Sequence, residues 1–414
     1  MVYFIRIIKT TEYGMDYKKP NIFAYRFTQF LAWFAAKFLF RRKFLRNELR
    51  GKKGPCVVIA NHQCALDFIN LIGATRTPMS FVISNSFYST LPIQGILKSI
   101  GAIPKQQFQT AVTDIRRMKA TVDNGGILAL YPAGLMCEDG ISTPIPVATY
   151  RFLQFLRADV YVAKTVGSYF VSPKWSKKKR PGRTYIDIYR LATAEELSKM
   201  NPDSFKSLAE EALLFDAYRE QDEYRIKYKS PDIEGIENVL YMCPHCKKEF
   251  SMRVKDGYTL YCDECGYELV SDKYSMLHNE KGIGKEIRYV SDFSREIYQS
   301  LKKEIEAGKA LPLTASAKIQ TIDYKNKKFV DSGDGILTVT NEKIILKGKV
   351  GSESLDISMP ANAYPSLPFS PGKHLELQEG DNIYRLVLDD GKLVMKFINV
   401  IKIFYEKAQN PKSN

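Results

Sequence analysis

The chain has 414 residues, of which 45% are hydrophobic and 26% charged, and its formal net charge is +15. This composition excludes a disordered chain, a collagen-like chain and a small disulfide framework, and the length allows two to four domains. The positive charge favours an anionic partner, either nucleic acid or an anionic membrane surface.

Most of the excess positive charge lies at the start of the chain. Residues 1–53 contain thirteen Lys and Arg against three acidic residues, a net charge of +10. Residues 27–40 read FTQFLAWFAAKFLF, which as a helix would span about 21 Å, whereas a bilayer core is about 30 Å thick. Gln29 and Lys37 also interrupt this run. We predict neither a transmembrane span nor a signal peptide, and expect residues 1–50 to form a basic aromatic segment in a membrane interface. Packing of the same helix on a core is the alternative.

The next feature is an apolar run followed by a histidine and an acid. The β-branched run 56–60 is bounded by turn residues, as in a buried parallel strand. His62 and Asp67 would not share a face of one helix, but they can meet across a strand-end loop and the first turn of the next helix. There Asp67 could hold one imidazole nitrogen and leave the other as a general base. A hydrogen-bonded loop histidine beside a helix N-terminus is the other interpretation.

The motif at residues 61–67, NHxxxxD, resembles the first signature of the glycerolipid acyltransferases, the family of 1-acylglycerol-3-phosphate acyltransferase. Three later segments resemble the family's further blocks, in the same order. These are IGAIPK at 100–105 (the second block), LYPAG at 130–134 (the third block) and VYVAKT at 160–165 (the fourth block). The resemblance extends from residue 22 to about residue 190.

The resemblance implies a mechanism. His62 would take the proton from an acceptor hydroxyl, which attacks the thioester carbonyl of acyl-CoA or acyl-ACP, and Asp67 would orient His62. Cys64 is expected to be an inert thiol. The expected acceptor is a lysophospholipid, first of all 1-acylglycerol-3-phosphate, which would give phosphatidic acid. Another lysolipid or a glycolipid is the alternative. Substrate contacts are implied for Asn61, Lys105, Pro132, Gly134 and Lys164.

Two of the blocks depart from the family pattern. Ala133 replaces a Glu, Leu135-Met136 replaces Thr-Arg, and Gln107 replaces an Arg downstream of the second block. Ala133 cannot hydrogen-bond an acceptor, and the missing Arg at Met136 removes an expected phosphate ligand. We therefore assign the phosphate-binding role to Lys105 and Lys164, each of which offers a mobile point charge.

Two charged segments near these blocks have open interpretations. Residues 138–140 read Glu-Asp-Gly, which either supplies acidic contacts to the site or is an ordinary surface turn. The basic run 174–183, KWSKKKRPGR, is either a solvated loop or a second lipid-facing segment, because Trp175 beside Lys is typical of membrane interfaces.

Four of the seven cysteines predict a metal site. Two C-x2-C pairs are separated by fifteen residues, a spacing typical of zinc sites, and Asp256-Gly257 between them predicts a hairpin with a type I′ turn. We predict a zinc ribbon at 237–275 with a closed, structural zinc ion, and His245 as a bystander. Reduced thiols indicate a cytosolic compartment. The predicted ligands are Cys243, Cys246, Cys262 and Cys265.

The charge of this region decides between the two anionic partners. Residues 241–272 carry four basic and six acidic side chains, a net charge of −2, whereas phosphate binding needs clustered positive charge. We therefore predict membrane lipids, and no nucleic acid, as partners.

Downstream of the fourth block, helices give way to strands. Residues 203–229 predict one charged helix within a helical linker at 201–236, and apolar spacing predicts a helix at 292–306. Two hairpins follow, and a helix at 392–407 ends the chain. Strands with one C-terminal helix resemble a pleckstrin-homology or GRAM-type domain, here residues 285–414.

The predicted fold class is α/β. An acyltransferase-type mixed sheet flanked by helices, at residues 51–200, would be followed by the zinc ribbon and a small β-rich domain with a C-terminal helix. The protein would be a peripheral acyltransferase on the cytoplasmic face of the cell membrane, using an acyl carrier protein or coenzyme A thioester. A catalytically degenerate membrane adaptor and a nucleic-acid-binding zinc protein are the competing hypotheses. The His62–Asp67 pair argues against the first, and the acidic ribbon against the second.

Overall fold

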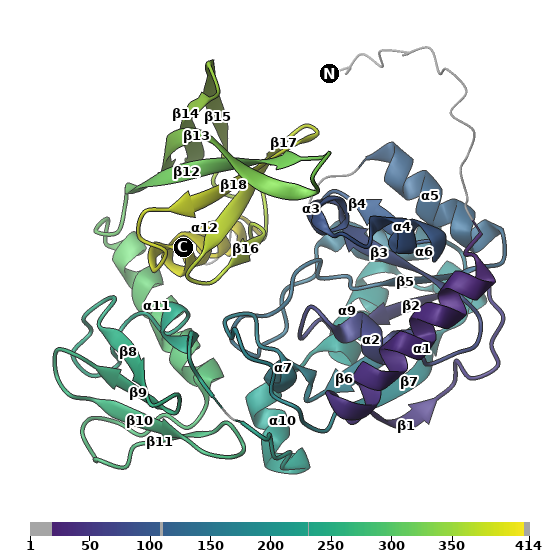
Figure 1. Ribbon diagram of the computed structural model, residues 1–414, viewed down its shortest axis with the longest axis horizontal. Coiled ribbons are helices and arrows are strands. Elements are labelled where there is room, and N and C mark those ends of the chain that lie inside the picture. Colours follow the sequence, from purple (N-terminus) through teal and green to yellow (C-terminus); the bar gives the residue numbers. More distant parts are fainter. Residues whose placement is uncertain (1–18, 108–110, 231, 410–414) are drawn as a thin grey trace.

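The computed structural model describes residues 19–107, 111–230 and 232–409, so the first part of the predicted segment 1–50 lies outside the described residues. The described N-terminal half contains a seven-stranded sheet in the spatial order β1-β7-β6-β2-β5-β3-β4 (Figure 1). Its strands are β1 (Lys43–Asn47), β2 (Cys56–Ala60), β3 (Met79–Ser84), β4 (Ile103–Lys105), β5 (Ile127–Leu130), β6 (Asp159–Val166) and β7 (Tyr185–Ala192).

Helices cover both faces of this sheet (Figure 1). The helices of this half of the chain, including α7 and α10, which pack beside the sheet rather than on it, are α1 (Ile22–Phe38), α2 (Asp67–Ile72), α3 (Asn85–Thr90), α4 (Gln94–Ser99), α5 (Val112–Asp123), α6 (Val147–Phe155), α7 (Ser168–Val171), α8 (Ala194–Lys199), α9 (Pro202–Leu213) and α10 (Ala217–Tyr224).

The central strand β2 shows why both faces are covered. It pairs in parallel with β5 and β6, and all five of its residues are buried, as predicted for a parallel strand. Val58 packs in a cluster with residues of α1, α2 and α4, while Val57 and Ile59 pack in a second cluster with α5, α6, α8 and α9. Because neighbouring residues of a strand point to opposite faces, one apolar run fills two cores. The predicted sheet flanked by helices is confirmed.

The first strand extends this sheet at its edge. β1 pairs in parallel with β7, and Arg46 forms an ion pair with Asp187 across this edge, with 2.8 Å between Nε and Oδ1. Residues 43–47 of the predicted interface segment are therefore part of the sheet.

The prediction of one continuous helix over residues 203–229 is wrong. Helix α9 ends at Leu213 and α10 begins at Ala217. Asp216 caps α10, because its side chain accepts hydrogen bonds from the backbone amides of Tyr218 and Arg219. Phe205 and Leu213 of α9 are buried in a core of the first sheet, so α9 belongs to that layer rather than to a free linker.

The cysteine module, residues 237–275, contains three strands of a small antiparallel sheet with the order β11-β10-β9-β8. Asp256 and Gly257 both have positive φ between β8 and β9, which is the type I′ turn that the sequence predicts. The elements of this region are η1 (Ile236–Asn238), β8 (Met252–Lys255), β9 (Thr259–Cys262), β10 (Glu268–Ser271) and β11 (Leu277–His278).

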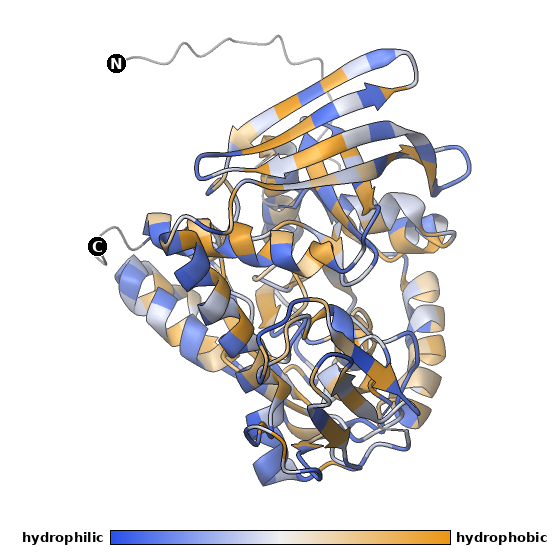
Figure 2. Ribbon diagram, turned by 90° about the vertical axis from the view of Figure 1, so that its left-hand side faces the viewer, coloured by the Kyte–Doolittle hydropathy of each residue, from blue (hydrophilic) through white to orange (hydrophobic). Residues whose placement is uncertain are grey.

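The C-terminal domain extends from α11 to α12 and contains a second seven-stranded sheet, which is antiparallel and has the order β15-β14-β13-β12-β18-β17-β16. Its strands alternate in hydropathy along their length, as expected for a sheet with one buried face (Figure 2). The elements are α11 (Val290–Glu306), β12 (Leu313–Asp323), β13 (Lys328–Val339), β14 (Lys343–Val350), β15 (Glu353–Pro360), β16 (Phe369–Ser370), β17 (His374–Glu379), β18 (Asn382–Leu388) and α12 (Leu393–Gln409).

Both predicted hairpins and both predicted helices of this domain are present, and a β-rich region with a C-terminal helix is confirmed. One continuous apolar core joins α7, α10, the cysteine module and the C-terminal domain. The C-terminal parts are therefore packed against the first domain. None of the helices in the described part of the chain combines the length and the apolar character that crossing a bilayer requires.

Candidate active site

The pair predicted from the first block is formed. His62 lies on the loop after β2 and Asp67 is the first residue of α2, so the pair meets across a strand end and a helix start as expected. His62 Nδ1 lies 3.0 Å from Asp67 Oδ2. The Asp67 side chain is 1% exposed and that of His62 19%. With Nδ1 held by the carboxylate, Nε2 is the imidazole nitrogen left to exchange a proton with a substrate.

The carboxylate of Asp67 is held rigidly. Besides His62, Oδ2 accepts hydrogen bonds from the backbone amides of Gln63, at 2.7 Å, and Cys64, at 2.9 Å. Oδ1 accepts from Ser168 Oγ at 2.6 Å and from the Cys64 thiol at 3.3 Å. Ser168 begins α7, shortly after the fourth block, and is not among the site residues predicted from the sequence. No motif marks this serine, because its role depends on where the chain returns after β6.

An aromatic ring fixes the other side of the imidazole. Tyr131 of the third block stacks on His62, with 4.3 Å between ring centroids and 24° between the planes. Burial, followed by the charge of Asp67, raises the pKa of Tyr131 well above its usual value, so the phenol stays neutral. We conclude that Tyr131 orients His62 as a flat surface rather than as an acid or base.

A hollow of about 360 Å³ opens beside His62. The turn of the third block forms one wall and the end of α9 forms another. Its lining combines apolar side chains with hydroxyls and two carboxylates, so it presents both apolar and polar groups next to the imidazole. The lining residues are Ala60, Asn61, His62, Pro132, Ala133, Leu135, Ser142, Thr143, Pro144, Ile145, Glu210, Glu211, Leu213, Leu214 and Phe215.

The remaining predicted substrate contacts are placed unevenly around this hollow. Pro132 lines it, and Gly134, with φ of +71°, closes the predicted turn by donating its amide to the carbonyl of Tyr131 at 2.9 Å. Asn61 also lines the hollow, but its amide donates to the carbonyl of Thr165 and accepts from the Thr165 amide, each at 2.8 Å. Asn61 therefore ties β2 to β6, and its contact with substrate stays a prediction.

The two lysines assigned to phosphate are not among the described residues that line the hollow. Lys105 Nζ donates to the carbonyl of Gln106 at 2.8 Å, and burial lowers the pKa of Lys105. Lys164 Nζ donates to the carbonyl of Leu214 at 3.0 Å, at the rim of the hollow. Gln107, which stands where the resemblance implies an Arg, donates to the carbonyl of Gly134 at 2.6 Å and so braces the turn of the third block.

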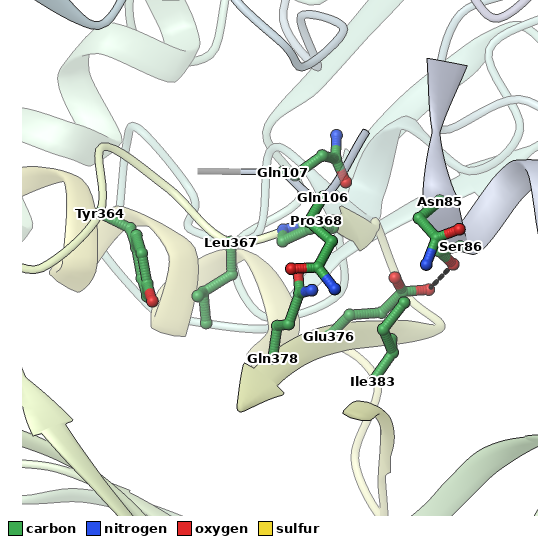
Figure 3. A pocket seen from close by; sticks show the side chains of 10 residues that line it. All are labelled: Asn85, Ser86, Gln106, Gln107, Tyr364, Leu367, Pro368, Glu376, Gln378 and Ile383. Atoms are coloured by element: carbon green, nitrogen blue, oxygen red, sulfur yellow. Dashed lines mark hydrogen bonds between the residues drawn. The ribbon is translucent and has the colours of Figure 1, made fainter. Parts of the chain in front are cut away.

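The C-terminal sheet packs against the second block, next to the turn of the third block. Figure 3 shows a small hollow there, where Ser86 Oγ donates to Glu376 Oε1 at 3.3 Å. Gln106 Nε2 donates to Asp381 Oδ1 at 2.9 Å across the same boundary. The second block thus lies between the first domain and the C-terminal domain.

The lipid-facing interpretation of the basic run at 174–183 is wrong where it rests on Trp175. This side chain is 5% exposed, and its Nε1 donates to the hydroxyl of Tyr169 at 3.0 Å. Arg180 is fully buried and donates to the carbonyl of Phe170 at 2.7 Å. Sequence patterns alone could not show this, because the partners come from α7, packed beneath the run.

The four predicted zinc ligands converge. Their sulfur atoms all lie within 4.8 Å of one another, and the Cys243–Cys265 and Cys246–Cys262 pairs are each 3.7 Å apart. A tetrahedron with Zn–S bonds of about 2.3 Å has sulfur–sulfur edges of about 3.8 Å, so this arrangement fits the ion. The distances are far too long for disulfides. His245 is outside the cluster and stacks on Tyr267, as expected for a bystander.

Helix α1 presents its largest apolar side chains to the outside. Phe23 is 83% exposed and Phe38 61%, whereas the small residues Ala32 and Ala36 face the domain. Gln29, which interrupts the apolar run, points inward and donates to the carbonyls of Ile72 and Thr75. The other exposed apolar residues of the helix are Ile22, Phe27, Phe30, Leu31, Trp33 and Phe34.

Two comparisons with known proteins gave a match. Residues 41–172 match the family model described as Acyltransferase. Among solved structures, the 1-acyl-sn-glycerophosphate (LPA) acyltransferase PlsC from Thermotoga maritima is similar, with 16% sequence identity and a TM-score of 0.41. That match covers 49% of this chain and 79% of the other. No curated protein matches the chain.

Proposed function

We propose, from the match of residues 41–172 to the acyltransferase family model, that the chain moves a fatty acyl group from an acyl thioester to the hydroxyl of a glycerolipid acceptor. The observation that carries the proposal is the His62–Asp67 pair beside the hollow, with 3.0 Å between Nδ1 and Oδ2.

The proposed reaction uses His62 as general base and then as general acid. Nε2 takes the proton of the acceptor hydroxyl as its oxygen attacks the thioester carbonyl carbon, and the carbonyl oxygen gains negative charge. When the tetrahedral intermediate collapses, the C–S bond breaks and His62 returns the proton to the departing thiol. Asp67 holds the tautomer and stabilises the imidazolium. Cys64 is not assigned as a nucleophile. Burial, followed by the charge of Asp67, raises the pKa of its thiol well above the usual value, so the thiol stays protonated.

The acceptor is the finer part of the proposal. We take 1-acylglycerol-3-phosphate first, because the motif at residues 61–67 and the three later blocks resemble those of the 1-acylglycerol-3-phosphate acyltransferases. Lys105 and Lys164 would have to turn toward the phosphate in the complex. Another lysolipid or a glycolipid is the second candidate, favoured by the absence of Lys and Arg among the described residues that line the hollow.

A panel of acceptors tests the function. Purified protein would be given lysophosphatidate, other lysophospholipids and glycolipids, each with acyl-CoA and with acyl-ACP, and ester formation would be measured. We expect turnover with at least one pair. Exclusive use of an acceptor without phosphate would refute the roles of Lys105 and Lys164. Absence of turnover with every pair would favour a membrane adaptor, an alternative to which the loss of the family's Glu at Ala133 already points.

The protein would work as a peripheral enzyme on the cytoplasmic face of the cell membrane. The support is α1, whose exposed rings could enter the interface while Arg26 and Lys37 meet anionic headgroups.

The four cysteines would hold a structural zinc ion, which closes the module without an open position for catalysis. Metal analysis should find about one zinc per chain, lost on Cys262→Ser; a metal-free, folded wild-type protein would contradict this role.

A further inference from the structure

The loop that follows the third block connects the hollow to the first block. Leu135 lines the hollow, and two residues later the amide of Cys137 donates to the carbonyl of His62 at 3.4 Å. The thiol of Cys137 lies 3.9 Å from the carbonyl of Gln63. The position of residues 135–140 therefore bears directly on the backbone that carries the proposed general base.

The next residue of this loop, Glu138, faces another domain. It is 4% exposed, so the interpretation of residues 138–140 as an ordinary surface turn is wrong. Its carboxylate forms an ion pair with Lys402 of α12, and its carbonyl accepts from the hydroxyl of Tyr169 at 3.1 Å. A residue from the last helix of the chain thus contacts the loop beside the hollow.

A second contact from the C-terminal domain holds the same loop. Lys174 Nζ lies 3.3 Å from the centre of the Phe369 ring in β16, and it donates to the carbonyl of Met136 at 3.4 Å. The loop is therefore held by α12 at Glu138 and, through Lys174, by β16 at Met136.

The charges at this boundary stabilise one another. Burial raises the pKa of Glu138, but the charges of Lys402 and Lys174 more than offset it, and the net pKa lies below the usual value. Burial lowers the pKa of Lys402, and Glu138 reverses this effect, so that Lys402 stays charged. Removing Lys402 leaves the buried Glu138 carboxylate with Lys174 as its remaining neighbouring cation and without its ion-pair partner, a loss costly enough to displace a loop.

We propose that Lys402 is a positioning residue of the active site, supplied by the C-terminal domain to hold residues 135–140 and, through Cys137, the backbone of His62. The role rests on the proposed acyl transfer. It gives the C-terminal domain a part in the reaction. The sequence does not predict this part, because Lys402 and Glu138 are far apart in the chain.

Helix α12 also supplies the matched control. Lys396 forms an ion pair with Glu249 of the cysteine module, with 2.6 Å between Nζ and Oε2, about 1.7 turns before Lys402. Lys396→Met thus breaks a half-buried ion pair of the same helix and the same chemistry, without touching the loop beside the hollow.

The test compares Lys402→Met, Lys402→Arg and Lys396→Met in the full chain. At a temperature well below the Tm of every variant, we expect Lys402→Met to lower kcat about tenfold or more, with the KM for the acyl donor changed less than about twofold. Lys402→Arg should recover most of kcat, since it restores the charge, and Lys396→Met should keep kcat within about twofold. Unchanged kcat in Lys402→Met, or no recovery in Lys402→Arg, would overturn the positioning role.

Hydrogen exchange separates this proposal from the acyl transfer itself. Lys402→Met should speed amide exchange in peptides that cover residues 61–64 and 135–140, while Lys396→Met should leave both unchanged. Equal exchange in the two variants would refute the coupling. A wild-type protein without turnover would refute the acyl transfer, and the exchange result would still decide whether Lys402 orders the loop.

Discussion

Helices α1 and α12 have the same length, 17 residues, and both mix large apolar side chains with lysine, yet they are oriented in opposite ways. In α12, Phe397 and Ile401 are fully buried, whereas in α1 the phenylalanines are exposed and the alanines face the domain. The charges follow the same division. Lys402 of α12 pairs with a buried Glu, whereas Lys37 of α1 lies over the exposed ring of Trp33, at 4.7 Å.

This contrast shows that an apolar stripe in the sequence predicts a helix but not which side of that helix is buried. Helix α12 is covered by α11 and the C-terminal sheet, so its large side chains have a core to enter. Helix α1 packs on α2 and α4 through Tyr25 and small residues such as Ala32 and Ala36, which leaves its phenylalanine and tryptophan rings outside. We infer that α12 stabilises the interior of the protein and positions the active-site loop, whereas α1 binds an apolar phase outside the protein, such as a membrane.

The largest expected effect is on stability, through α12. Phe397→Ala should lower the free energy of unfolding by about 3–5 kcal/mol, because it leaves a cavity in a packed core. Phe30→Ala in α1 should change the free energy of unfolding by no more than about 0.5 kcal/mol, because that ring is exposed and makes few packing contacts. Denaturant unfolding would measure both. Equal losses in the two variants would contradict the opposite orientations.

A second effect should appear in acid, in the domain that α12 covers. Burial, followed by the charges of Arg385, Lys373 and Lys174, lowers the pKa of His374 to about 3. Glu376 lies 3.9 Å away but does not reverse this, because it already pairs with Arg385 at 2.8 Å. In the unfolded chain His374 titrates near its ordinary pKa of 6.5.

The sign of the pH dependence follows from these values. Below pH 6.5 His374 binds a proton in the unfolded chain, whereas in the folded chain it stays neutral down to about pH 3. The free energy of unfolding therefore falls as the pH is lowered. Between pH 7 and pH 4 this group alone should cost about 3 kcal/mol. His374→Gln should flatten that part of the curve of unfolding free energy against pH. A variant as acid-sensitive as the wild type would remove His374 from the explanation.

The third effect should appear on membranes, through α1. Phe27→Ser combined with Phe30→Ser should weaken binding to anionic phospholipid vesicles by about 2 kcal/mol, roughly 30-fold, with little change in Tm. Tyr324→Ser removes another exposed aromatic side chain, at the turn after β12, and is the matched control. Equal weakening in the control, or none in the α1 variant, would contradict a lipid-facing α1.

The sequence predicted the parts of the site that depend on local order. His62 and Asp67 could be paired because a strand end and a helix start bring them together, and the four cysteines because their spacing closes a metal site. Ser168, Tyr131 and Lys402 were missed as members of the site. Their roles depend on how distant segments pack against the first block, and Lys402 arrives from the other end of the chain.

The same reason explains the wrong predictions. The run at 174–183 shows its charges in the sequence but not the aromatic pocket that buries Trp175 and Arg180. The charged stretch at 203–229 does not reveal that Asp216 would cap a new helix, because aspartate is also common on exposed helix surfaces.

The most direct test of the proposed mechanism is acyl transfer by His62→Ala, measured beside the wild type with the acceptor and donor that the panel identifies. We predict that kcat falls by about 10²–10⁴-fold, the usual worth of a general base, while the Tm stays within a few degrees and vesicle binding is kept. A His62→Ala protein that retains full acyl transfer would contradict the proposed mechanism.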